Sequence, residues 1–274
     1  IAIMPSQYPP ESGRTPGKHR PPVTRQVAPQ RVFRWLAEGW RLFVERPVEW
    51  VLMALAAFVL LVLSTLAVTL PLIGPLLPPL LMTLLLAGML YAAHQQVVNH
   101  RLRVAQLFEG FRRHPGNLTL IGVFYALPLI LMHLLTMLAL GGGLLIGLLG
   151  FSLGTTVNQL AAGAISFLAG LGILWVLFLL LWGMLLLAML FAPALVMLNN
   201  YPPLDAMRYS LKASLGSLGA IVVLALCLYV LFVVALIPLG LGVLVYIPVV
   251  VGSLHAAYQD VFAVTEPAAP TQTS

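Results

Sequence analysis

The stretch GAISFLAGLGILWVLFLLLWGMLLLAMLFAPALVML occupies residues 163–198 and contains no Asp, Glu, Lys or Arg in its 36 residues. A helix of about 20 apolar residues already crosses a hydrocarbon core about 30 Å thick. At about 1.5 Å per residue, this stretch is longer than the core is thick. We therefore expect it to tilt, to bend near Gly170, Gly172 or Pro193, or to project beyond the membrane.

The composition of the whole chain agrees with this stretch. Of its 274 residues, 61% are hydrophobic and 8% are charged, whereas an ordinary soluble domain has about 25% charged residues. The apolar runs are unbroken and lack the alternation of barrel strands. The sequence therefore predicts an all-α integral membrane protein.

The positions of polar and helix-breaking residues predict six transmembrane helices arranged as three hairpins. Gly141-Gly142-Gly143 is expected to end the third span, and residues 144–160 then read as a re-entrant or interfacial segment. Residues 1–31 form a basic, Pro-rich tail that we expect to be disordered or partner-bound, 32–262 form the membrane domain, and 263–274 form a short second tail. The predicted spans lie near 50–70, 78–98, 118–140, 163–198, 218–238 and 242–262.

The 14 Lys and Arg residues predict the orientation. Eight precede the first span, four lie between the second and third, and two lie between the fourth and fifth. Even numbers of spans separate these segments, so all three lie on one side, which the positive-inside rule assigns to the cytoplasm. We expect a bacterial inner-membrane protein with both termini in the cytoplasm. Its charge of +6 then follows from topology and contact with anionic lipid, and no nucleic-acid partner is expected.

The three cytoplasmic segments resemble one another. Residues 38–41 read E-G-W-R, 109–112 read E-G-F-R, and 209–212 read Y-S-L-K, each followed by Pro or Gly. A repeat of this kind predicts a short amphipathic helix at the cytoplasmic interface before each hairpin. The residues expected in the headgroup layer are Trp35, Trp40, Arg41, Phe111, Arg112, Arg113, Arg208 and Lys212.

Several motifs together resemble a family of bacterial inner-membrane proteins. They are W-L-x-E-G-W-R-L-F-x-x-x-P at 35–47, F-A-P-A-L-V at 191–196, P-L-D-A-M-x-x-S-L-K at 203–212 and Y-Q-D-V-F at 258–262. The chain resembles the YciC-like proteins and the membrane domain attached to some glycerophosphodiester phosphodiesterases. The resemblance implies a multi-pass helical fold over residues 32–262 and brings no catalytic residues.

Polar residues inside apolar segments are costly and often functional. His133 lies in the third span and is the candidate for binding a ligand or cofactor. The favoured interpretation is a neutral His that is hydrogen-bonded to a neighbouring helix, because no Asp, Glu, Lys or Arg lies inside the predicted spans apart from Asp260 at the end of the sixth. Asn158 and Gln159 are the other candidates for an intramembrane polar site. We expect His94 and His100 to mark a polar helix end, and Asp260 to pair with Arg208 or Arg112.

No nucleophile with a base, no paired carboxylates, no phosphate-binding loop and no metal-ligand cluster occurs in the sequence. We therefore expect a protein without enzymatic activity, cofactor or metal. The leading hypothesis is an accessory, scaffold or assembly subunit of a larger membrane-protein complex. The alternative is a small-molecule or lipid transporter, for which a midplane cavity lined by His133, Asn158 or Gln159 would be expected.

Overall fold

The computed structural model describes residues 22, 24–67, 74–152 and 156–262. Every regular element within these ranges is a helix, so the all-α prediction is confirmed for the described residues. In chain order the elements are η1 (Pro29–Arg31), α1 (Val32–Glu45), α2 (Pro47–Leu66), η3 (Gly74–Leu76), α3 (Leu77–Asn99), η4 (Val104–Phe108), α4 (Glu109–Arg113), α5 (Pro115–Ser152), α6 (Val157–Leu190), α7 (Ala192–Asn199), α8 (Pro203–Gly216), α9 (Leu218–Leu236) and α10 (Val243–Val261).

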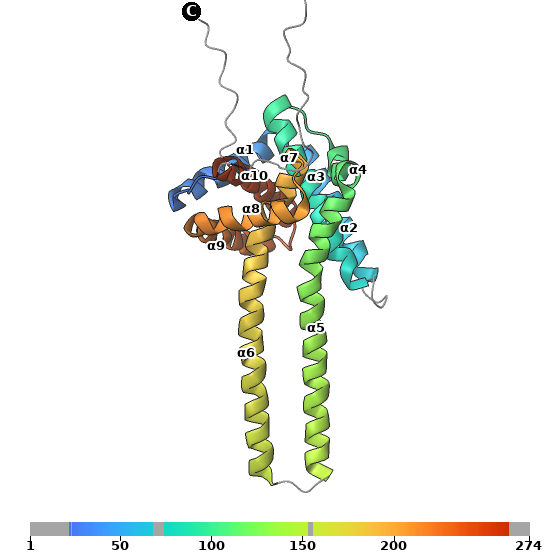
Figure 1. Ribbon diagram of the computed structural model, residues 1–274. Coiled ribbons are helices and arrows are strands. Elements are labelled where there is room, and N and C mark those ends of the chain that lie inside the picture. The colour runs from blue at the N-terminus through green and yellow to red at the C-terminus, as the bar shows by residue number, and fades with distance from the viewer. Residues whose placement is uncertain (1–21, 23, 68–73, 153–155, 263–274) are drawn as a thin grey trace, which may run out of the picture.

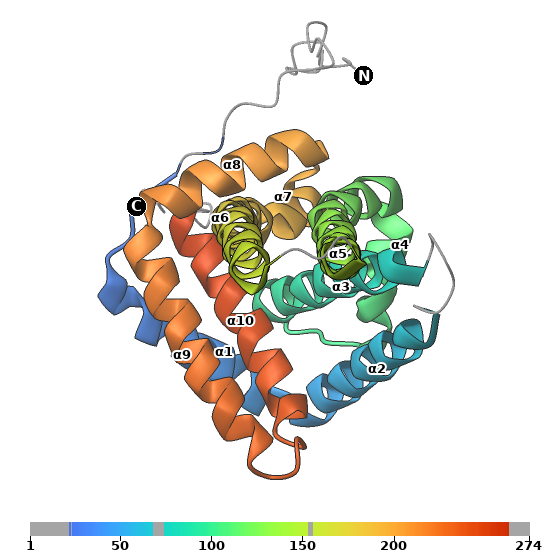
Figure 2. The same cartoon turned by 90° about the horizontal axis from the view of Figure 1, so that it is seen from below.

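Two helices project far beyond the others. α5 and α6 run antiparallel and extend away from the group of remaining helices (Figure 1). With 38 and 34 residues, α5 and α6 are about 57 Å and 51 Å long. α8, α9 and α10 lie across the direction of this pair, as Figure 2 also shows. We call α5 and α6 the hairpin and the other helices the body.

The predicted break at Gly141-Gly142-Gly143 is wrong, because α5 continues through these glycines to Ser152. The re-entrant or interfacial segment predicted for 144–160 is wrong for the same reason. Residues 144–152 belong to α5, 157–160 begin α6, and 153–155 lie outside the described residues. Glycine weakens a helix in water by about 1 kcal/mol. In lipid, however, a break would leave backbone groups without partners, so the helix continues.

The bend expected in the long apolar stretch occurs at Phe191, between the end of α6 and the start of α7, and Pro193 lies in the first turn of α7. Proline has no N–H to continue a helix, and α8 supplies hydrogen bonds at this point. The Oγ of Ser210 accepts the Phe191 N–H at 3.0 Å and donates to the Leu187 carbonyl at 2.9 Å. Ser214 Oγ donates to the same carbonyl at 3.0 Å, so the helix end is held against α8.

Five segments are long and apolar enough to cross a membrane, among the described residues. The share of each apolar window that is buried ranges from 6% in Gly172–Asn199 to 56% in Leu77–Asn99. The sixth predicted span forms α10, which does not meet the same length and composition test. The other candidates are Pro47–Leu66, Pro115–Gly142 and Leu218–Leu236.

The two ends of the described chain lie side by side. The N–H of Arg25 donates to the carbonyl of Val261 at 2.8 Å, and the N–H of Val27 donates to the Oγ of Ser217 at 3.1 Å. The last part of the predicted tail, residues 24–31, therefore packs on the body. Its earlier part, apart from residue 22, and the predicted second tail lie outside the described residues.

The three repeated segments hold equivalent places in the body. α1 packs on α10, α4 packs on α3, and α8 packs on α6. The small residue of each motif lies at the contact: a Cβ on Gly39 would lie 2.5 Å from Val249 O, and one on Gly110 would lie 2.3 Å from Leu84 O. In the third segment Ser210 bonds to Leu187. Each segment is followed by two helices: α2 and α3 after α1, α5 and α6 after α4, and α9 and α10 after α8. Each segment packs on the second helix of the preceding pair, and α1 packs on the second helix of the last pair.

Candidate functional site

A polar pocket of about 690 Å³ opens between the end of α3 and the segment that leads into α5. Three residues on successive turns of α3 line one side, and three arginines from the following segment line the other. We call it the arginine pocket. The residues that define it are Tyr91, Gln95, Asn99, Arg101, Arg103 and Arg112.

Local backbone geometry places the arginines at the pocket. α3 ends at His100, whose left-handed backbone (φ 51°) turns the chain. The Leu102 side chain is buried, whereas Arg101 and Arg103 on either side of it are exposed. Gly88 lets η4 lie directly on α3, because a Cβ there would be 2.0 Å from the Leu107 carbonyl oxygen.

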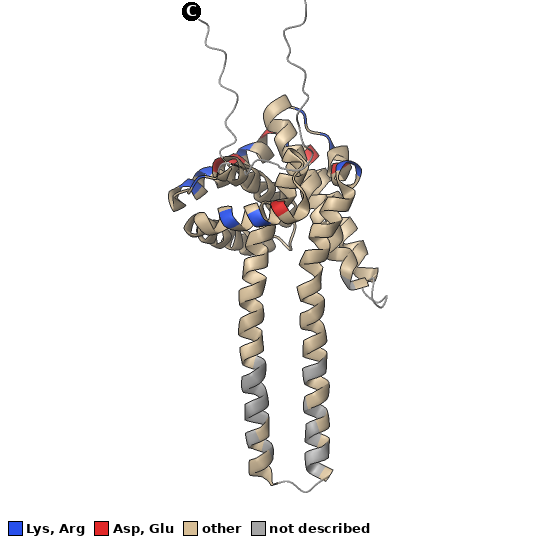
Figure 3. Cartoon of the chain, in the orientation of Figure 1, with Lys and Arg blue, Asp and Glu red and all other residues tan. Residues whose placement is uncertain are grey.

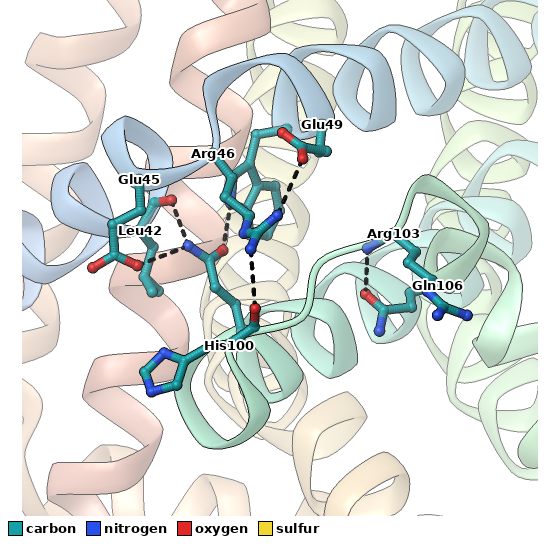
Figure 4. A network of polar contacts seen from close by, with 9 residues as sticks. Leu42, Glu45, Arg46, Glu49, His100, Arg103 and Gln106 are labelled. Carbon is teal, nitrogen blue, oxygen red and sulfur yellow. Dashed lines mark hydrogen bonds and ion pairs between the residues drawn. The ribbon is translucent and has the colours of Figure 1, made fainter.

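Hydrogen bonds hold the same turn (Figure 4). Arg46 donates from Nη2 to the His100 carbonyl at 3.1 Å and from Nη1 to Glu49 Oε1 at 3.3 Å. The Arg103 N–H donates to Gln106 Oε1 at 3.0 Å. The backbone of the segment that carries the pocket arginines is therefore attached, at His100, to Arg46 at the start of α2. The side chains of Arg101 and Arg103 stay exposed.

The charge in the arginine pocket is unbalanced. Among the described residues, Arg101, Arg103 and Arg112 form no ion pair with a carboxylate. Glu109 also lines the pocket, but its Oε2 accepts from Arg113 Nε at 2.8 Å. The pocket thus keeps an excess of positive charge and can bind an anion.

Arg113 contacts two of the residues that line the pocket, Tyr91 and Glu109. Its guanidinium carbon lies 4.3 Å from the centroid of the Tyr91 ring, and its Nη2 donates to the Tyr91 hydroxyl at 2.7 Å. A cation over an aromatic face is attracted by the ring quadrupole. The contacts with Tyr91 join α4 to α3, whereas the bond between Arg113 and Glu109 lies within α4.

A buried amide lies on the same helix. Gln96 is 2% exposed and its Oε1 accepts from Trp50 Nε1 at 2.8 Å. Its Nε2 donates to the Leu42 carbonyl at 2.9 Å and to Glu45 Oε2 at 3.1 Å. Buried polar groups need such partners, so Gln96 joins α1, α2 and α3.

Two histidines that lie far apart in the sequence meet inside the body. His255 Nε2 lies 3.4 Å from His94 Nδ1, and the two rings are tilted at 56°. His255 is 1% exposed, and its Nδ1 is a buried side-chain atom without a hydrogen-bond partner in the described part of the chain. Burial, and secondarily the neighbouring His94, lower the pKa of His255 to about 4. The prediction that His94 merely marks a polar helix end misses this contact.

Asp260 binds the start of α1, so the predicted pairing with Arg208 or Arg112 is wrong. Its carboxylate accepts from Trp35 Nε1 at 2.8 Å, from Arg31 at 3.2 Å and from Arg34 at 3.3 Å. Residues 31 and 35 lie one turn apart on the same helical face, so one carboxylate reaches both. This spacing is visible in the sequence, but the identity of the partner is not.

The predicted headgroup residues of α1 divide into buried and exposed members. Trp35 is 1% exposed and lies in the core, where it contacts α10 through Asp260. Trp40 is 52% exposed, and Arg41 is exposed and paired with Glu38 and Glu45. The predicted amphipathic periodicity of α1 is present, but its apolar face is buried by protein.

The remaining predicted headgroup residues are all exposed. Phe111, next to Phe108, and Arg112 and Arg113 lie on α4, whereas Arg208 and Lys212 lie on α8. Lys and Arg gather on the body, away from the tips of α5 and α6 (Figure 3). The structure brings Arg112 to the arginine pocket, and it places Arg208 next to Asp205 at 3.9 Å.

The structure separates the predicted intramembrane polar residues. His133 is exposed on α5, and Asn158 and Gln159 are exposed in the first turn of α6. His133 lies 19 residues before the end of α5 at Ser152, which is about 28 Å along the helix. Gln159 instead completes the N-terminal cap of α6 with Thr156. In the described residues these three side chains do not form one site.

Comparison of the chain with protein-family models, with curated proteins and with solved structures gives no match. The resemblance to the YciC-like membrane proteins therefore stays a prediction from its motifs.

Proposed function

We propose that this chain is a non-enzymatic integral membrane protein that acts by association, as an accessory, scaffold or assembly subunit of a larger bacterial inner-membrane complex. The observation that carries this proposal is a set of glycines on the hairpin with open space beside them. A Cβ built on any of them would meet no atom within 4 Å, apart from neighbouring residues and the local helix backbone. They are Gly141, Gly142, Gly163, Gly172 and Gly183.

Small residues matter in membranes because they let helix backbones approach closely, which drives helix association where the hydrophobic effect is absent. Within the described part of the chain these glycines serve no such contact. Large side chains around them are exposed as well, among them Ile173 at 65% and Leu180 at 63%. Helices of a second membrane protein would fill this space, and the hairpin is therefore the proposed contact surface.

We further propose that the hairpin crosses the bilayer and that the body lies on the cytoplasmic side, partly embedded. The contact between Arg25 and Val261 places both ends of the body together, which requires an even number of crossings. Five crossing helices would violate this requirement. The two hairpin helices satisfy this requirement, as the six predicted spans would. The transverse direction of α9 (Figure 1) favours the arrangement with two crossings, in which α9 stays within one leaflet.

Crosslinking in intact membranes tests the proposed contact surface. A photo-crosslinking amino acid replaces Leu177 on α6, which is 57% exposed, or Leu226 on α9, which is 60% exposed and serves as the matched control. We expect position 177 to give a discrete crosslinked species and position 226 to give lipid adducts only. Mass spectrometry then identifies the crosslinked polypeptide.

A second variant links the crosslink to the open space. Gly172→Leu fills the space beside the hairpin. It should reduce crosslinking several-fold from a crosslinker at Val176, which lies one turn further on the same face of α6 and is 57% exposed, while the variant still inserts in the membrane. The proposal fails if position 177 gives no protein crosslink and gentle extraction yields only a lone monomer. It also fails if positions 177 and 226 crosslink equally.

A further inference from the structure

We propose that the arginine pocket binds a phosphate group, carried either by a phospholipid headgroup or by a free phosphate compound. Three arginines without a carboxylate partner in the described structure line one pocket of about 690 Å³. Guanidinium groups bind phosphate oxygens through charge-assisted and often bidentate hydrogen bonds. The pocket goes beyond the proposed association of the hairpin and does not depend on it.

The arginines converge from two directions. Arg101 and Arg103 follow α3 and flank the buried Leu102, so both side chains lie on the exposed side of this segment. Arg112 comes from α4, across the pocket. Donors from separate elements surround an anion better than neighbouring residues on one helix, because they approach it from different sides.

Neutral donors complete the lining. Gln95 and Asn99 lie one turn apart on α3, and Asn99 Nδ2 donates to Gln95 Oε1 at 2.6 Å. This bond orients both amides and leaves N–H groups of each for a ligand. The Tyr91 hydroxyl accepts from Arg113, so its own hydrogen is also available. A phosphate has enough acceptor lone pairs to bind both the charged guanidinium donors and the neutral amide and hydroxyl donors.

The position of the pocket favours a lipid as the source of the phosphate. Charged residues gather on the body, away from the hairpin tips (Figure 3). If the hairpin crosses the bilayer as proposed, the charged residues of the body lie at the level of the cytoplasmic headgroups, where anionic lipids attract arginine. Only the choice of a lipid source rests on the proposed crossing. Recognition of phosphate rests on the pocket itself.

The test measures binding to the intact 274-residue chain in a neutral detergent. Phosphatidylglycerol and a diacylglycerol with the same chains are titrated separately and counted by native mass spectrometry, and inorganic phosphate is titrated by calorimetry. The pocket variant is Arg101→Gln/Arg103→Gln. Its matched control, Arg208→Gln/Lys212→Gln, removes the same two charges from exposed positions on α8.

We expect the pocket variant to weaken binding of phosphatidylglycerol at least about tenfold, because bonds between charged groups are lost. The control variant should stay within about twofold of the unaltered protein, and the diacylglycerol should bind weakly to all of them. If only inorganic phosphate binds and the pocket variant weakens that binding, the ligand is a free phosphate and the proposal stands.

Arg112→Gln, on a separate element, should weaken binding of the same ligand. Equal thermal midpoints verify that the variants fold. Two results overturn the proposal. Either neither phosphate compound binds the unaltered protein, or the pocket and control variants lose equal affinity, which would indicate attraction by net charge alone.

Discussion

Gly39 on α1 and Gly252 on α10 lie so close that a Cβ built on Gly252 would be 2.7 Å from the Cα of Gly39. A Cβ on Gly39 would in turn lie 2.5 Å from the Val249 carbonyl oxygen and 2.6 Å from Ser253 Oγ. The nearest atom in each case, the Gly39 Cα or the Val249 carbonyl oxygen, belongs to backbone, which cannot move away as a flexible side chain can. Glycine at both positions is what lets α1 lie directly on α10.

Gly39→Ala should therefore lower the free energy of unfolding by about 1–3 kcal/mol, the usual cost of overpacking, and the contact with backbone favours the upper end. Gly110→Ala should act similarly, because its Cβ would lie 2.3 Å from the Leu84 carbonyl oxygen. Thermal unfolding of the purified protein in detergent measures both. Gly183→Ala is the control, since nothing lies within 4 Å of that Cβ, and it should not lower the midpoint. Unchanged stability of Gly39→Ala would contradict the close packing.

Asp260→Asn should loosen the start of α1. The change removes the charge that Arg31 and Arg34 share, while an amide oxygen still accepts from Trp35. Because both arginines are partly exposed, we expect a loss of only about 1–2 kcal/mol. Amide hydrogen exchange over residues 24–36 should become faster. Asp205→Asn is the control, as its partner Arg208 is 3.9 Å away and 78% exposed, and it should leave exchange in α1 unchanged.

Gln96→Leu should cost about 2–4 kcal/mol of stability. It leaves the Trp50 indole N–H and the Leu42 carbonyl without their partner, and both groups belong to buried residues. Unsatisfied buried groups account for this large cost. In a Trp50→Phe background the cost should fall by about 1 kcal/mol, because the indole donor is already absent. Additive effects of the two changes would exclude the bond between them.

Acid should destabilise the protein through His255. Its pKa is lowered to about 4 by burial and by His94, whereas an unfolded chain has a His pKa of about 6.5. Between these values the unfolded chain binds a proton that the folded protein does not. The contribution of neutral His255 to the free energy of unfolding is therefore fully present above about pH 6.5. The free energy of unfolding then falls by about 3 kcal/mol as the pH approaches 4.

His255→Leu should flatten this pH dependence, measured as the difference between thermal midpoints at neutral and mildly acidic pH. His100→Gln, at an exposed position, should retain the full dependence. An identical pH profile for His255→Leu and the unaltered protein would mean that the buried imidazole does not control acid stability.

Much of the local structure could be predicted from the sequence. Residues 35, 39 and 42 follow helical spacing, and the structure buries them on one face of α1. The repeated E-G-W-R and E-G-F-R motifs predicted equivalent segments, and their glycines do make equivalent close contacts. These features are local, since spacing along one helix decides which side chains share a face.

Long-range pairings could not be predicted in the same way. Arg31 and Asp260 are 229 residues apart, and His94 and His255 are 161 apart. A carboxylate near one end of a membrane protein has several candidate arginines, and only the packing of α1 on α10 selects among them. The arginine pocket likewise depends on how α4 folds back on α3.

Residue types and their order are enough to predict that this chain is helical, apolar and sorted by charge, because backbone groups in lipid must bond within their own helix and cations avoid the hydrocarbon. They do not determine which apolar helices run together away from the body. A hairpin that crosses the bilayer and one that turns back inside it both return their charged ends to the same side, so charge sorting is identical for the two. Only the tertiary structure separated the long pair α5 and α6 from the transverse α9, through contacts between residues far apart in the chain.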